Sequence, residues 1–300
     1  MIGALACLGA CHDRGSNPLK LKAGIVLCKL ALIMLIVAAP IGAASEALRV
    51  GGSGSTLGTA KLIGDAFSRQ HPTTTLRIVP NLGSGGALKA LAAGNLEIAL
   101  ISRPLKPEEA AGGLIATEYG RSPFVFVTNR TDLESLTLQE ATDIVAARKS
   151  HWPDGSRIRL VLRPAADIDS DLLAAIAPGM REALAIARKR EGMVIAVTDQ
   201  DAATEVERLP GGIGTSTLAL VRSEKRNLKI LALEGVQPSP ATIADGRYRS
   251  MKTMYAVTRS DPSALTRQYI EFLRSSAARK ILVDNAHWIP EQRDQTHGAR

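Results

Sequence analysis

Two short segments rich in glycine and serine are the parts of this 300-residue chain best suited to bind an anion. The first is Gly-Gly-Ser-Gly-Ser-Thr at 51–56, and the second is Gly-Ser-Gly-Gly at 83–86. Each follows a run typical of a β-strand and precedes a helical pattern. Free backbone N–H groups, hydroxyls and the positive end of a helix dipole attract negative charge there. Either segment alone could be a tight turn, but two in succession favour an oxyanion site.

The motifs of nucleotide-binding proteins and hydrolases do not fit these loops. A dinucleotide fingerprint would need glycine where Leu57 stands, and Ser53 and Ser84 lack the flanking glycines of a nucleophile elbow. The five histidines are far apart and have no metal-ligand spacing. We therefore expect no catalytic residues, no metal and no cofactor. An α/β hydrolase that uses Ser84 or Ser55 with the acidic residues of 167–171 is the less favoured alternative.

Ser102 and Arg103 follow directly after the third expected strand, so their side chains should reach the same edge of the sheet as the two loops. An arginine can donate two parallel hydrogen bonds to an oxyanion. Arg103 could equally be a surface residue that pairs with Glu108 or Glu109. The sequence leaves both interpretations open.

Arg163 holds the corresponding place after a later expected strand, 159–162. It is the second arginine that could bind an oxyanion. The acidic segment Asp-Ile-Asp-Ser-Asp at 167–171 follows it. Asp167 and Asp169 could face the ligand, or this segment could simply cap the next helix.

The elements that must position these residues alternate between strands and helices, which predicts an α/β fold with a largely parallel sheet. The expected strands are 48–50, 75–79, 96–101, 124–127, 159–162, 194–197, 213–221, 228–233 and 254–258. The expected helices are 56–69, 85–93, 137–147, 170–190 and 262–275. A capping box at 137–140 should open the third helix, and Pro178-Gly179 should interrupt the fourth.

The first 44 residues have the character of a targeting leader. Three lysines precede the apolar run 30–39, and small residues at 42–44 offer a cleavage site. A membrane anchor is the alternative, but the run is shorter than the roughly 20 residues that a spanning helix needs. We expect an exported, periplasmic protein that starts near Ser45. All three cysteines lie in the leader, so the mature chain has neither a disulfide nor a thiol nucleophile.

Composition argues against a nucleic-acid-binding protein. Of the formal net charge of +8, +3 belongs to the leader and +5 to the remaining residues. Aromatic residues make up 3% of the chain, and the basic residues are scattered rather than gathered in a stripe.

Four segments, in this order, are similar to the periplasmic phosphate-binding proteins of phosphate ABC transporters. They are GSGSTLGTAKLIGDAFSRQHP, GSGGALKALAAGNLEIALISRPLKPEE, LTLQEATDIVAARKSHWPDGSRIRLVLRP and LPGGIGTSTLALV. The resemblance implies the type II periplasmic binding-protein fold, with two lobes that close over the ligand. It also implies a monomer that delivers phosphate or another oxyanion to an ABC transporter permease. The lobes would be 45–122 plus 236–300, and 123–235.

The resemblance also implies which residues bind. The family's contacts in the first loop fall on Ser55, Thr56 and the backbone N–H of Leu57. Those in the second loop fall on Ser84, with Gly85 beside it. The family's arginine falls on Arg163.

Two departures from the family pattern concern the other side of the site. Ser102 and Arg103 stand where many members have an aspartate, and Asp167-Ile168-Asp169 replaces a usual Ser-Gly-Thr. A carboxylate 4 Å from a bound anion would repel it by about 4 kcal/mol per charge pair at an effective dielectric near 20. Either this loop turns away, or the ligand is not free phosphate. A sensor or envelope interaction protein with a diverged site is therefore the alternative within the same fold.

Overall fold

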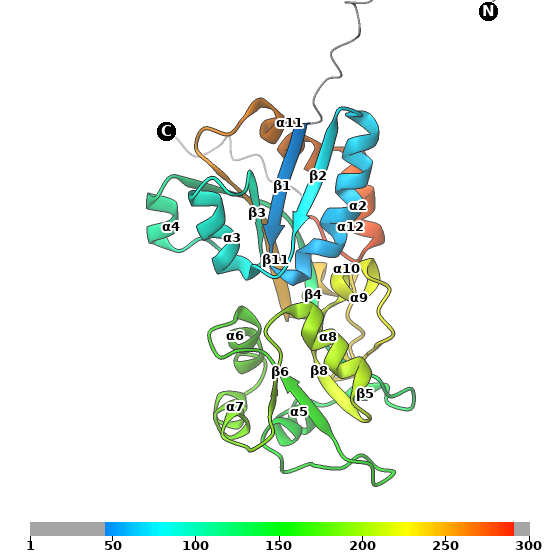
Figure 1. Cartoon of the computed structure of the whole chain (residues 1–300). Helices are drawn as coiled ribbons and strands as arrows, with labels where there is room; N and C mark the ends of the chain where they lie inside the picture. The colour runs from blue at the N-terminus through cyan, green and yellow to red at the C-terminus, as the bar shows by residue number, and fades with distance from the viewer. Residues whose placement is uncertain (1–45, 291–300) are drawn as a thin grey trace, which may run out of the picture. The chain divides into compact units, whose positions relative to one another are not determined.

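The structure, a computed structural model that describes residues 46–290, is built on one large β-sheet (Figure 1). Its strands are β1 (Glu46–Gly52), β2 (Thr74–Val79), β3 (Ile98–Ile101), β4 (Leu114–Thr128), β6 (Arg159–Leu162), β7 (Val194–Ile195), β8 (Gly212–Thr217), β9 (Lys229–Ile230) and β11 (Met251–Arg259). They lie in the order β2-β1-β3-β11-β4-β8-β6-β7, with β9 beside β4. A small separate sheet pairs β5 (Ser135–Leu136) with β10 (Ala232–Leu233).

Helices cover both faces of this sheet. They are α2 (Gly54–Gln70), α3 (Gly83–Ala92), α4 (Pro107–Ala111), α5 (Leu138–Val145), α6 (Ile168–Ala174), α7 (Met180–Arg188), α8 (Asp199–Arg208), α9 (Leu218–Ser223), α10 (Pro240–Ala244), α11 (Ala264–Leu273) and α12 (Ser276–Asp284). One apolar cluster joins α2, α11 and α12 to β1 and β3, and another joins α3 to the opposite side of β3. Phe67, fully buried, packs edge-on against Tyr269 and Phe272 in the first cluster.

Strand β1 places the two glycine loops together, because it pairs in parallel with both β2 and β3. Gly51 lies opposite Val79 of β2, and Gly52 lies opposite Leu100 of β3. The carboxyl ends of all three strands therefore meet at one edge of the sheet, where open α/β sheets bind ligands. The predicted α/β class and the shared edge of the two loops are confirmed.

Strands β4 and β11 connect the two ends of the sheet. β4 pairs with β11 from Leu114 to Pro123, and from Phe124 to Thr128 it pairs with β8. Both pairings are antiparallel, so the sheet is mixed. Separate apolar clusters lie around β1–β3 and around β6–β8.

The predicted strand 213–221 is wrong in its second half. β8 ends at Thr217, whose hydroxyl accepts a hydrogen bond from the Leu220 N–H and opens helix α9. Every residue from 218 to 221 is buried, so the hydrophobicity of this run does not distinguish a strand from a helix. The predicted run 228–233 is two short strands, and β5, α4, α8, α10 and α12 have no predicted counterpart.

The predicted break in the helix at 170–190 is confirmed. The chain forms two helices, α6 and α7, and Gly179 before the second has φ of 76°, a left-handed conformation that suits glycine. The predicted capping box is also present, since Thr137 accepts from the Glu140 N–H at the start of α5.

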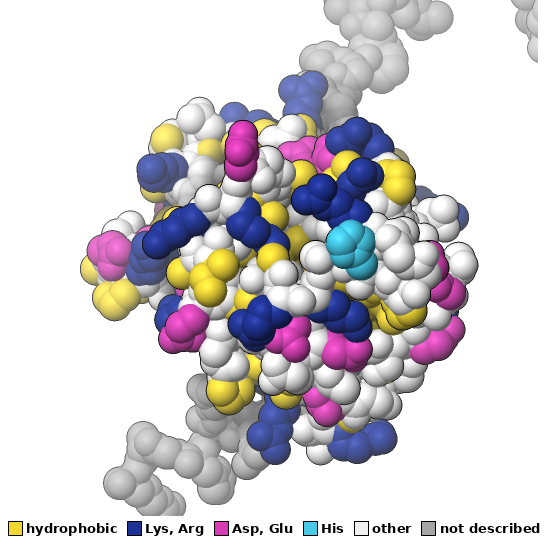
Figure 2. Space-filling view, turned by 90° about the horizontal axis from the view of Figure 1, so that it is seen from below, with side chains coloured by type: hydrophobic (Ala, Val, Ile, Leu, Met, Phe, Trp, Pro, Cys, Tyr) yellow, Lys and Arg dark blue, Asp and Glu magenta, His cyan; other side chains and the backbone are white. Residues whose placement is uncertain are grey.

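The surface agrees with the scattered charge of the sequence. Seen from below, acidic side chains lie among the basic ones, and no large hydrophobic patch appears on that face (Figure 2). Within residues 46–290, no helix combines the length and apolar character needed to cross a bilayer. The predicted leader at 1–44 lies outside the described residues.

We predict that Gly52→Ala destabilises the protein by at least about 2 kcal/mol, because overpacking a tight site usually costs 1–3 kcal/mol. The added Cβ would lie 1.8 Å from the carbonyl oxygen of Leu100, so β1 and β3 would have to separate. Urea unfolding would measure the change. Gly85→Ala is the matched control: its Cβ meets nothing within 4 Å, and it should be neutral or slightly stabilising. Equal stability of the two variants would contradict the prediction.

Candidate binding site

A cavity of about 510 Å³ opens at the carboxyl edge of β1, β2 and β3. Residues from five segments form its wall, and these are 52–54, 81–85, 102–106, 163–171 and 197–200. The first three segments follow β1, β2 and β3, whereas the last two follow β6 and β7. The cavity is therefore built from both ends of the sheet.

The sequence-predicted site residues divide into two groups. Those that line the cavity are Ser84, Gly85, Ser102, Arg103, Arg163 and Asp167. Those that do not line it, each at most 9% exposed, are Ser55, Thr56, Leu57 and Asp169. In the second group, Asp169 donates its N–H to Asp167, and the Ser55 and Thr56 hydroxyls contact Ser53, which lines the cavity.

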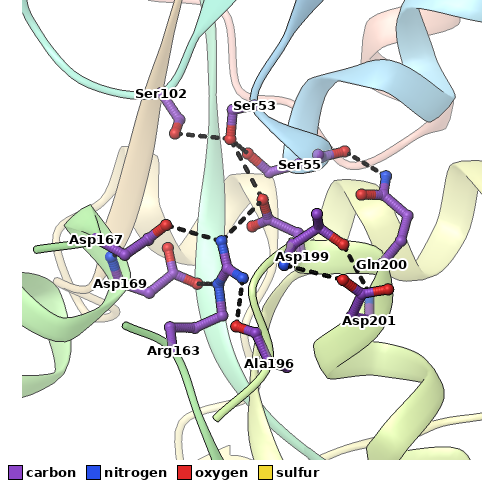
Figure 3. Close-up of polar contacts among 12 residues, drawn as sticks. Ser53, Ser55, Ser102, Arg163, Asp167, Asp169, Ala196, Asp199, Gln200 and Asp201 are labelled. Carbon is purple, nitrogen blue, oxygen red and sulfur yellow. Dashed lines mark hydrogen bonds and ion pairs between the residues drawn. The ribbon is translucent and has the colours of Figure 1, made fainter. Parts of the chain in front are cut away.

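Three serine hydroxyls converge at the start of α2 (Figure 3). The Ser102 hydroxyl donates to Ser53 Oγ over 3.0 Å, and Ser53 Oγ lies 2.9 Å from Ser55 Oγ. The Ser53 N–H donates to the Leu100 carbonyl over 2.8 Å, and the Thr56 hydroxyl donates to the Ser53 carbonyl over 2.7 Å. These hydrogen bonds fix the loop, and its residues 52–54 line the cavity.

The second loop brings a second helix start to the cavity. Gly83 has φ of 61°, which a glycine adopts without strain, and α3 begins there. Ser84 Oγ accepts a hydrogen bond of 3.3 Å from the Ser102 N–H, which ties the second loop to the end of β3.

Arg163 is 6% exposed and lies against one carbonyl and three carboxylates of its own chain. Its Nη1 donates to the Ala196 carbonyl and its Nη2 to Asp167 Oδ2, both over 2.7 Å. Nη2 also lies 3.7 Å from Asp199 Oδ2. Among the described residues, its Nε–H has no hydrogen-bond partner. The guanidinium is therefore fixed in orientation and surrounded by carboxylates.

Asp167 both caps a helix and faces the cavity. Its Oδ1 accepts from the Asp169 N–H over 3.0 Å at the start of α6, while its Oδ2 accepts from Arg163. Asp169 turns away from the cavity and is 2% exposed. The two aspartates of the acidic loop thus point in different directions.

Arg103 is bound to Glu109 by two hydrogen bonds of 2.8 and 2.7 Å. This bidentate pair lowers the pKa of Glu109 to about 2. The surface pairing considered for Arg103 is therefore present, even though the residue also lines the cavity.

Lys252 of β11 was not among the residues predicted from the sequence, and it is 1% exposed. Its ammonium forms an ion pair with Asp169 and lies 2.9 Å from Asp199 Oδ1. Burial alone would lower the pKa of Lys252, but these two carboxylates outweigh it and raise the pKa above its ordinary value. The side chain therefore stays charged inside the protein.

Asp199 and Asp169 respond differently to this shared cation. Burial raises the pKa of Asp169 to about 7, and the nearby Asp199 and Asp167 carboxylates add to the rise. Burial acts on Asp199 in the same direction, but Lys252, Arg163 and the Ser55 N–H outweigh it and hold its pKa below the ordinary value. Near neutral pH, Asp199 is charged and Asp169 is close to its midpoint.

Asp199 and Gln200 were also missed, although their sequence carried a signal. Thr198 and Asp201 form a capping box that opens α8 directly after β7, which is the same strand-then-helix arrangement as in the two glycine loops. A search for helix starts, rather than for glycine, would have found this third segment of the cavity wall.

The fold and the place of the cavity define the class of protein. A mixed sheet flanked by helices, with a cavity at its carboxyl edge, is the type II periplasmic binding-protein fold. The chain belongs to the family described as the PBP superfamily domain, whose profile matches residues 37–277. The family resemblance inferred from the four motifs is confirmed.

Individual relatives agree with this assignment. The chain is 21% identical over 260 residues to the phosphate-binding protein PstS of Bacillus subtilis, covering 82% of this chain and 81% of the relative. A Clostridium perfringens structure, described as a phosphate ABC transporter substrate-binding protein with bound phosphate, is 20% identical with a TM-score of 0.70. It covers 82% of this chain and 100% of that chain. The periplasmic molybdate-binding protein of Azotobacter vinelandii is 15% identical with a TM-score of 0.61, covering 81% and 100%.

We predict that Asp169 makes the protein less stable as pH rises from about 4 to 7. Its carboxyl is protonated in the folded state up to about pH 7, whereas in the unfolded chain it ionises near pH 4. The folded state therefore binds more protons in this window, and its stability falls as pH rises. At about 1.4 kcal/mol per pKa unit, the loss is on the order of 2–4 kcal/mol.

Urea unfolding at several pH values would measure this slope in the wild type and in Asp169→Asn, which should lack it. Asp171→Asn, at an exposed position of the same helix, should keep the wild-type slope. Parallel pH profiles for the wild type and Asp169→Asn would show that Asp169 ionises normally in the folded protein.

Proposed function

We propose that this protein is an extracytoplasmic solute-binding protein that captures phosphate or a related oxyanion for an ABC importer. The observation that carries the proposal is the meeting of two helix starts, the Ser53 and Ser102 hydroxyls and Arg163 at one cavity. Each of these groups donates hydrogen bonds, and together they suit an anion with several oxygens. The phosphate and molybdate binding of similar proteins supports the same ligand class.

The ligand would be gripped between two lobes. We assign 45–122 plus 236–300 to one lobe and 123–235 to the other, because β4 changes its partner from β11 to β8 after Pro123. The cavity wall takes segments from both assigned lobes. A rotation about β4 and β11 would open and close the cavity and present the closed form to a permease.

A hydrolase function has little support from the geometry. Within residues 46–290, neither Ser55 nor Ser84 has a hydrogen bond from its hydroxyl to a histidine or a carboxylate. Ser53 does approach Asp199 at 3.4 Å, but the lowered pKa of that carboxylate makes it a weak base. We therefore propose binding without turnover.

Isothermal titration of the purified protein with phosphate, sulfate and molybdate tests the proposal. Binding of at least one of these oxyanions is expected, with a preference among them that follows size and charge. No heat and no thermal stabilisation with any of the three would refute it.

We predict that Arg163→Ala weakens oxyanion binding by about 2–5 kcal/mol, because truncating one partner of a buried charge pair leaves the other unpaired. Titration with the tightest-binding oxyanion would measure the loss. Arg159→Ala is the matched control, since Arg159 is an exposed residue at the start of the same strand. Equal affinity of the two variants would place Arg163 outside the binding site.

A further inference from the structure

The carboxylate of Asp199 already lies where the proposed oxyanion would bind. Lys252, Arg163 and the Ser55 backbone N–H at the start of α2 hold its pKa low, and its Oδ2 lies 3.4 Å from Ser53 Oγ. The same Oδ2 is 3.7 Å from Arg163 Nη2, and Oδ1 is 2.9 Å from Lys252 Nζ. Figure 3 shows the Ser53 hydroxyl and the Arg163 guanidinium directed at this one internal anion, and Lys252 lies against its other oxygen.

Asp199 comes from a distant part of the chain, so this arrangement is not ordinary helix capping. The first turn of α2 contains no acidic residue, and Ser53 makes no side-chain cap. Asp199 is instead the first residue of α8, and Gln200, the next residue, holds the start of α8 against the start of α2. Gln200 Nε2 donates to the Gly54 carbonyl over 2.8 Å. A Cβ on Gly54 would meet Gln200 Oε1 at 2.1 Å and Asp199 Cβ at 2.8 Å, so the start of α8 is seated directly on the start of α2.

We propose that Asp199 is a specificity-determining residue that acts as an internal competitor for the oxyanion site. The inference rests on the proposed function and deepens it. An incoming oxyanion must displace the Asp199 carboxylate from the α2 start, from Ser53 and from Arg163 before it can use these donors. The residue therefore lowers affinity for every oxyanion, and it does so most for dianions, which the displaced carboxylate would still repel.

The surrounding charges offer no compensation for a displaced carboxylate. The two buried cations, Arg163 and Lys252, are shared among Asp167, Asp169 and Asp199. Each cation thus already has internal carboxylate partners, and neither is left unpaired for an added dianion. Removing the Asp199 charge alone leaves both cations in place and frees the donors for a ligand.

Titration of Asp199→Asn with sulfate and phosphate at fixed pH tests the inference. Asparagine keeps the size of the side chain and removes its charge. We expect at least about tenfold tighter binding than in the wild type, with the larger gain for sulfate, because close charge pairs at binding sites couple strongly. Asp171→Asn is the charge-matched control: it removes one negative charge from the same cavity wall, at an exposed position that contacts none of these donors.

A gain with Asp199→Asn that is at least several times larger than the gain with Asp171→Asn supports the inference. Equal gains would mean a general charge effect and would overturn it, as would unchanged or weaker binding by Asp199→Asn while the wild type binds. If Asp199→Asn does not fold, as judged by thermal unfolding, Asp199→Asn combined with Lys252→Met removes two opposite charges together and serves in its place.

Amide hydrogen exchange gives a readout that does not depend on a bound anion. In chloride buffer, Asp199→Ala should exchange faster than the wild type at 53–57, because the start of α2 loses the side chain that is seated against it, and Asp171→Ala should not. If no variant binds sulfate or phosphate, the proposed function fails. Faster exchange in Asp199→Ala would then still support the internal anion, and unchanged exchange would overturn it.

Discussion

The requirement that a buried charge be paired organises the centre of this protein. Lys252 is almost completely buried, and its ammonium can remain charged only because Asp169 and Asp199 lie against it. Removing either carboxylate would leave part of that charge uncompensated, and such losses destabilise a protein more than the intact pair stabilises it. The positions of α6, α8 and β11 are therefore coupled to one another through this lysine.

This coupling explains why the cavity wall contains segments from both ends of the sheet. Lys252 lies on β11 opposite Ser122 of β4, next to the point where β4 changes its partner. Asp169 and Asp199 come from helices that follow β6 and β7. The ion cluster thus links β4 and β11, the strands that connect the two ends of the sheet, with α6 and α8. The starts of these two helices lie in the 163–171 and 197–200 segments of the cavity wall. Any movement that opens the cavity between α2 and α8 must also change the surroundings of Asp199.

Local sequence was sufficient for the α/β class, for many of the elements and for one side of the site. The glycine loops, the strand ends beside them and the position of Arg163 follow from strand and helix patterns, because parallel strands bring their carboxyl ends to one edge. Lys252 could not be found in this way. A lysine in a strand is ordinarily an exposed residue, and only the fold shows that two aspartates surround this one.

The acidic loop at 167–171 is a second place where local sequence was not sufficient to predict the site. The sequence raised the question whether Asp167 and Asp169 face a ligand, and it offered helix capping as the alternative. In the structure Asp167 caps α6 and also binds Arg163, whereas Asp169 is withdrawn to Lys252. Which of two neighbouring carboxylates meets the cavity is decided by cations far away in the chain, so spacing alone could not settle it.

An arginine that already has internal partners binds an anion differently from an arginine whose guanidinium is unpaired. The Arg163 Nη1 bond to the Ala196 carbonyl fixes the plane of the guanidinium in advance, so little side-chain entropy would be lost on binding. Its Nη2, by contrast, would exchange one anionic partner for another when a ligand arrives. Because one ion pair replaces another, the net gain from charge is small. Besides the charge of Asp199, selectivity would then depend on the fit of the ligand's oxygens to the Ser53 and Ser102 hydroxyls and the first turn of α2.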